Sequence, residues 1–104
     1  PPDMRSSVAF AIESIRQEFN PSDTDGWMLV PADHPVLDPN LVQDLIRVWE
    51  RDRPLILVPR CGTRRGHPTL FRWSLAHEVA SIPEQRGLNW LLEKHARSVR
   101  ELEV

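Results

Sequence analysis

The sequence predicts an α/β fold of three layers, in which helices pack on both faces of a sheet of mostly parallel strands. Two apolar runs without polar alternation, residues 27–30 and 54–59, have the pattern of strands buried on both faces of a parallel sheet. Between them lies a segment whose apolar residues recur at helical spacing, so the three pieces form a strand–helix–strand unit. The right-handed crossover of such a unit makes its two strands parallel.

The first helix is predicted over residues 6–19. Its apolar side chains recur at helical spacing, at Val8, Ala11, Ile12, Ile15 and Phe19. The pair Asn20-Pro21 ends it, because the residue before a proline avoids the α region. Ser6 and Ser7 at its start have two interpretations: they cap the helix, or they contact an anion there. Capping is the safer of the two.

The second helix begins at Asp38-Pro39, which suits an N-cap followed by the first helical position. It follows the strand at residues 27–30, which a turn-rich loop over residues 21–26 precedes. The helix carries one apolar stripe, at Leu41, Val42, Leu45, Ile46 and Trp49.

The elements after the strand at residues 54–59 are shorter. A polar loop leads to a short apolar piece at residues 69–71. Two short helices are predicted near residues 74–80 and 88–97, with Gly87 as the break between them. The last six residues, "VRELEV", alternate apolar and charged side chains, as a half-exposed strand does.

Composition excludes several classes of function. Thirteen Lys and Arg against fifteen Asp and Glu give a formal net charge of −2, which argues against a nucleic-acid-binding surface. The single cysteine, Cys61, rules out an internal disulfide and fits a reducing compartment. No apolar run approaches the ~18 residues of a membrane span, so we expect a cytoplasmic protein without a membrane partner.

Both ends of the chain are unusual for a domain boundary. The opening "PPDMRSS" runs almost directly into a helix, and the chain stops at a strand. Neither end has the frayed polar tail usual at such a boundary. We therefore expect residues 1–104 to be a single partial domain from a longer chain.

Two loops follow carboxyl ends of predicted strands, where ligands bind in open α/β sheets: residues 31–38 and 59–68. In the first, Asp33 lies just past the strand between Pro31 and Pro35, which restrict the backbone. A hard oxygen ligand there suits Mg²⁺, which takes one or two carboxylates plus substrate phosphates. The equal alternative is a turn aspartate that bonds its own backbone.

The second loop is basic and glycine-rich. Its notable residues are Arg60, Gly62, Arg64, Arg65, Gly66 and His67. Glycine lets a backbone approach a ligand closely, and guanidinium groups match phosphate oxygens. The alternative, a solvated basic hairpin tip, is favoured without further context.

A zinc site built from Asp33, His34, Cys61 and His67 is a weaker alternative. Their spacing matches no C-x-x-C or H-x-x-x-H arrangement. The four tryptophans fall mostly on apolar stripes, which indicates core packing and not a base-stacking platform.

The order of these pieces resembles the MobA-like nucleotidyltransferases, most closely the molybdenum-cofactor cytidylyltransferases. "LVPADHP" is similar to that family's strand and Asp-x-Pro turn, and "RRGHPTLF" to its Arg-Gly-His-Pro segment. "DMRSSVAFAI" resembles its serine-containing helix start, and "RGLNWLLEKHARSVRELEV" its closing helix and strand. The resemblance covers essentially the whole chain and implies a Rossmann-like fold.

The resemblance also implies a reaction. A phosphate oxygen of an acceptor, such as molybdopterin, attacks the α-phosphate of CTP or GTP and releases pyrophosphate. Asp33 would bind the Mg²⁺ that bridges the nucleotide phosphates. Arg65, Gly66, His67 and Pro68, together with His34, would line the acceptor side, and Ser7 would lie near the base or ribose.

The chain departs from the family pattern in three places. The family's Gly-rich loop with Arg and Lys has no counterpart here, nor has the acid of an Asp/Asn-Thr-Pro segment after the last strand. Where relatives often have an aspartate before a glycine, this chain has Gln85-Arg86-Gly87. The resemblance is therefore to the acceptor-side half, and we expect these residues alone to be inactive.

A second hypothesis belongs to another class: a non-catalytic binding or assembly module that has lost the phosphate loop. An exposed apolar sheet edge would then drive pairing into a homodimer. A zinc-binding module is the third and weakest hypothesis.

Overall fold

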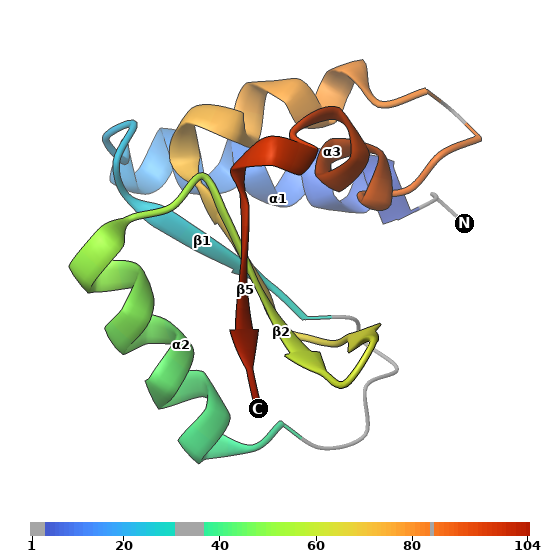
Figure 1. Ribbon diagram of the computed structural model, residues 1–104. Helices are drawn as coiled ribbons and strands as arrows, with labels where there is room; N and C mark the ends of the chain where they lie inside the picture. Colours follow the sequence, from blue (N-terminus) through green and yellow to red (C-terminus); the bar gives the residue numbers. More distant parts are fainter. Residues whose placement is uncertain (1–3, 31–36, 84) are drawn as a thin grey trace.

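A computed structural model describes residues 4–30, 37–83 and 85–104 of the chain. The predicted three-layer α/β architecture is confirmed (Figure 1). Helices α1 (Met4–Phe19), η1 (Trp73–Ser81) and α3 (Asn89–Lys94) cover one face of the sheet. Helix α2 (Pro39–Asp52) covers the other face.

The sheet of the described residues is mixed. Its strands are β1 (Gly26–Leu29), β2 (Ile56–Cys61), β3 (Arg64–Arg65), β4 (Thr69–Arg72) and β5 (Val99–Glu103). Strand β4 pairs antiparallel with both β1 and β2, so β1 and β2 run in the same direction with β4 between them. Because Ile56 pairs with both Phe71 and Val99, β4 and the parallel β5 lie on opposite edges of β2.

The expectation of parallel strands at residues 27–30 and 54–59 therefore holds for their direction but not for their adjacency. The interpretation of residues 27–30 as a strand buried on both faces is wrong. Gly26 is exposed and Trp27 to Leu29 are half-buried, because within the described residues β1 pairs with β4 alone. In contrast, β2 lies between two strands, and its first four residues are buried.

The polar loop predicted at residues 59–68 contains a hairpin. Strands β2 and β3 are joined by Gly62-Thr63, and Gly62 has the positive φ of +64° that glycine adopts without steric cost. Leu57 pairs with Leu70 but Arg60 pairs with Arg65, so the returning strand carries two extra residues. This bulge lies between β3 and β4, and it redirects the chain where the candidate residues lie.

The helices lie where the sequence analysis predicted them, but some are 3₁₀-helices and not α-helices. Helix α1 begins at Met4, two residues before the predicted start. The predicted helix near residues 74–80 is the 3₁₀-helix η1, and that at 88–97 divides into α3 and the short 3₁₀-helix η2 (Ala96–Ser98).

Two apolar clusters hold the layers together. One joins α1, η1 and α3 to the sheet through Ile56 and Phe71, both fully buried. The other joins α2 to the opposite face through Leu45, Trp49, Leu57 and Leu70. Asp38 caps α2 as predicted, because its side chain accepts a 2.9 Å hydrogen bond from the Asn40 amide.

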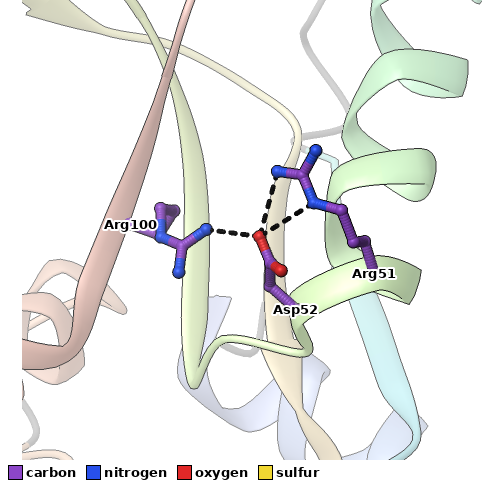
Figure 2. Close-up of polar contacts among 3 residues, drawn as sticks. All are labelled: Arg51, Asp52 and Arg100. Carbon is purple, nitrogen blue, oxygen red and sulfur yellow. Dashed lines mark hydrogen bonds and ion pairs between the residues drawn. The ribbon is translucent and has the colours of Figure 1, made fainter.

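A polar contact also ties α2 to β5. The Asp52 carboxylate at the end of α2 accepts hydrogen bonds from Arg51 and from Arg100 on β5, the latter at 2.7 Å (Figure 2). These bonds, that of Arg51 first, lower the pKa of Asp52 below its usual range. The ion pair is exposed, so it orients β5 more than it stabilises the fold.

Candidate functional site

A cleft of about 500 Å³ lies between the bulged segment and α3. Its strand side is formed by Val58, Arg65, Gly66, His67 and Thr69, and its helix side by Asn89, Leu92, Glu93 and Ala96. Val58 and Thr69 are buried in the sheet, whereas Arg65, Gly66 and His67 are exposed at its end. The cleft therefore combines apolar residues (Val58, Leu92 and Ala96) with several polar groups, the pattern of small-molecule sites.

Arg65 is held by a carboxylate from another strand. Its Nε donates a 2.9 Å hydrogen bond to Oε2 of Glu101 on β5. This hydrogen bond is the main cause that lowers the pKa of the Glu101 carboxyl, so the pair is charged at neutral pH. The arginine is thus fixed beside the cleft.

Gly66, His67 and Pro68 have different environments. The Gly66 amide donates a 2.8 Å hydrogen bond to the Pro59 carbonyl, which holds the bulged segment to β2. His67 is exposed and lines the cleft, whereas Pro68, joined to it by a cis peptide bond, is fully buried. Pro68 shapes the segment by packing and does not line the cleft.

The other residues of the basic loop form the hairpin tip. Cys61, Gly62, Thr63 and Arg64 are all exposed, which is the solvated-tip alternative for this part of the loop. Arg60 donates a 2.6 Å hydrogen bond to the Gly62 carbonyl and so stabilises the turn. It does not line the cleft.

Asp33 and His34 lie outside the described residues. The described end of β1 is next to a residue of the cleft. Leu29, the last residue of β1, pairs with Thr69, which lines the cleft and directly follows Pro68.

Ser7 lines a different hollow. It lies exposed on α1 beside a mostly apolar groove of about 470 Å³ between this helix and β1. The helix side of the groove includes Val8, Ile12 and Ile15, and the strand side is formed by residues 26–29. Within the described residues, the structure does not bring Ser7 into the cleft with Arg65.

Three polar residues near the cleft were missed by the sequence analysis. Asn89 and Glu93 line it from α3, and Glu101 holds Arg65. No pattern in the sequence marks Asn89 or Glu93, since helical spacing does not say what a polar face meets. Glu101 is one of the charged residues of the predicted strand "VRELEV", which was the available signal.

The described residues, 4–30, 37–83 and 85–104, contain no cluster of side chains arranged to bind a metal ion. No three His, Cys, Asp or Glu side chains of these residues gather as a metal site would require. The zinc alternative needs Asp33 and His34, which lie outside this part of the chain.

Among the described residues, no helix is long and apolar enough to cross a membrane.

Comparisons with known proteins place the chain in a family context. The sequence model described as "MobA-like NTP transferase domain" matches residues 4–99. No curated protein sequence matches the chain.

Solved structures from mycobacteria have the same fold. The manganese complex of Rv0371c from Mycobacterium tuberculosis H37Rv is 28% identical, with a TM-score of 0.74 over 94% of this chain and 49% of that one. A second Rv0371c structure is 24% identical, with a TM-score of 0.79 over 100% of this chain and 51% of that one. An Rv0371c homologue from Mycobacterium sp. strain JC1 is 22% identical, with a TM-score of 0.75 over 95% and 46%. The chain thus spans about half the length of these proteins.

Proposed function

Because the chain belongs to the MobA-like NTP transferase domain family, we propose that residues 1–104 are the acceptor-side half of a cytoplasmic nucleotidyltransferase domain. The parent protein transfers a nucleoside monophosphate from CTP or GTP to a phosphorylated small molecule, such as molybdopterin, and releases pyrophosphate. The observation that carries this proposal is a cleft that contains a fixed arginine, Arg65, at the end of the sheet where strands β1 and β2 terminate.

Arg65 is proposed to bind the phosphate of the acceptor. A guanidinium group keeps its charge at all physiological pH values and matches phosphate oxygens in pairs. Gly66 and His67, with His34, would form the rest of the acceptor side, and Pro68 supports it from the core. A cleft of about 500 Å³ has the size of a site for a small molecule.

The chain contributes positioning more than acid–base chemistry. The attacking group is a phosphate oxygen, which is already ionised at neutral pH, so the reaction needs no protein base to create the nucleophile. Arg65 would hold this phosphate and limit its motion, which lowers the entropy lost on reaching the transition state. Charge on the phosphates is offset by fixed cationic groups, as in other electrostatically organised sites.

A divalent cation is proposed at Asp33. One carboxylate is the donor set that Mg²⁺ commonly takes from a protein when nucleotide phosphates supply further oxygens. The Rv0371c structure with manganese supports a divalent metal in a related protein. When bound, such an ion neutralises phosphate charge and helps to align the reacting groups.

The rest of the domain is proposed to cover the open edge of β1. Within the described residues this strand pairs with β4 alone, and an apolar groove lies between it and α1. Phe10 and Phe19 on α1 are 76% and 69% exposed, which is unusual for large apolar side chains. The nucleotide-binding half would lie against this surface, with Ser7 near the base or ribose.

The same open edge supports an alternative function, a non-catalytic assembly module. A second copy of the chain would then pair along β1 and cover the groove. Sedimentation of the full-length protein distinguishes the two proposals. A monomer favours the nucleotidyltransferase, whereas a stable dimer that a charged substitution at Phe10 dissociates favours assembly.

Calorimetric titration of CTP and GTP, each with Mg²⁺, into the full-length protein tests the enzyme proposal. We expect micromolar binding of one nucleotide that requires Mg²⁺ and is weakened at least tenfold by Asp33→Asn. Asp44→Asn is the matched control, because Asp44 is exposed on α2 and pairs only with Arg47 among the contacts described. Absence of nucleotide binding by the full-length protein would contradict the proposal.

A further inference from the structure

One carboxylate of β5 lies between two arginines of neighbouring strands. Glu101 Oε2 accepts the 2.9 Å hydrogen bond from Arg65 Nε, and its Oε1 lies 3.2 Å from Arg60 Nε. The second contact is an ion pair without hydrogen-bond geometry. The Glu101 side chain is 33% exposed, so solvent only partly screens both contacts.

The two arginines differ in what remains for a ligand. Arg60 also uses Nη1 to bond the Gly62 carbonyl at 2.6 Å and directs Nη2 toward Glu103 Oε1 at 3.7 Å. In the contacts described, Arg65 is held through Nε. Only Arg65 of the two lines the cleft. Arg60 therefore has a structural role, whereas Arg65 lines the cleft and can contact a ligand there.

We propose that Glu101 is a positioning residue, which fixes the Arg65 guanidinium through Nε so that its terminal amino groups meet the anionic group of a ligand in the cleft. The ligand class is a phosphate ester or free phosphate. This inference rests on the proposed function, because it assumes that the cleft binds the acceptor phosphate.

Two effects of Glu101 on an anion oppose each other. Its negative charge repels the anion, while its bond to Nε removes rotamer freedom that Arg65 would otherwise lose when the ligand binds. A residue that only neutralised Arg65 would weaken binding, so its removal would tighten it. A positioning residue has the opposite signature, and the sign of the change in affinity therefore decides between them.

The experiment is a calorimetric titration of inorganic phosphate into the full-length protein and into Glu101→Ala, which removes the hydrogen-bond acceptor of Arg65 Nε. We expect Glu101→Ala to bind phosphate about three- to tenfold more weakly, because the ligand must then immobilise the long side chain of Arg65 itself. Glu103→Ala is the matched control: it removes the same side chain and charge from the same strand, and Glu103 contacts Arg60, not Arg65. Its phosphate affinity should be unchanged or higher.

A double-mutant cycle tests whether Glu101 acts through Arg65. In an Arg65→Ala background, Glu101→Ala should no longer weaken binding, which a general loss of structure would not produce. Thermal unfolding of each variant confirms that the fold is kept. Tighter binding by Glu101→Ala, or an equal loss in Glu103→Ala, would overturn the inference but leave the proposed acceptor site intact.

A different result separates the two proposals. If Arg65→Ala itself leaves phosphate affinity unchanged, the cleft is not the phosphate site. The acceptor role of Arg65 and the positioning role of Glu101 then both fail, whereas nucleotide binding that depends on Asp33 would still stand.

Discussion

Substitution of Gly26 by alanine tests how closely β1 packs against α2. A Cβ atom added at Gly26 would lie 2.8 Å from Cζ2, 2.9 Å from Cε2 and 3.0 Å from Cη2 of Trp49. These distances are below normal van der Waals contact, so the indole ring or the strand must shift. Trp49 is only 6% exposed, and the Arg53 guanidinium lies 4.8 Å from its ring centre, which leaves the ring little room to move.

Overpacking of a tight core by a single methyl group costs about 1–3 kcal/mol. We expect Gly26→Ala to lower the free energy of unfolding by about this amount. The loss should be near the upper end of this range if strand β1 has to shift together with the indole ring. The assay is urea unfolding of the full-length protein, followed by tryptophan fluorescence. An unchanged slope with a lower midpoint would show that stability itself has changed.

Gly87→Ala is the matched control, because it makes the same chemical change where no atom lies within 4 Å of the added Cβ. We expect its free energy of unfolding to stay within about 0.5 kcal/mol of the wild type. Equal stability of Gly26→Ala and Gly87→Ala would refute the close contact between β1 and Trp49. A Trp49→Phe change that suppresses the cost of Gly26→Ala would support it, since the smaller ring frees the space.

Two further predictions concern the α3 side of the molecule. Leu91 is fully buried, so Leu91→Ala should cost about 2–5 kcal/mol in urea unfolding, while Leu37→Ala, at a 38% exposed side chain, should cost far less. Burial acts to raise the pKa of Glu78, but hydrogen bonds from Lys94 and His95 outweigh it and lower this pKa. A lowered pKa stabilises the fold above the unfolded value and is lost as pH falls, so Glu78→Gln should destabilise more near pH 7 than near pH 3. Similar losses for the two leucines, or a Glu78→Gln effect independent of pH, would contradict these predictions.

Local patterns were enough to predict most of the elements. The apolar stripe of α2 and its Asp38 cap follow from helical spacing and from the chemistry of a helix start, both of which involve neighbouring residues only. The buried strand β2 was equally evident from its continuous apolar run. The type of the shorter helices was not, because one or two turns contain too few residues to separate a 3₁₀ from an α period.

The candidate site was predictable only in part. The sequence pointed to the segment 65–68 because guanidinium and glycine occur together there, and the structure places Arg65, Gly66 and His67 at a cleft. Loop composition could not separate Arg65 from Arg60, since both are arginines of one loop, and only the family resemblance singled out Arg65. Both contact Glu101, which is 36 positions away from Arg65 along the chain, but only Arg65 lines the cleft, whereas Arg60 bonds the Gly62 carbonyl.

The sequence by itself determined the α/β class, the order of the elements and the family, because these depend on local periodicity and short motifs. Only the tertiary structure decided that β4 lies between β1 and β2, that two extra residues bulge after β3, and that β5 supplies a carboxylate to Arg65. Strand pairing is chosen by burial and hydrogen bonding between distant segments, so no local pattern specifies it.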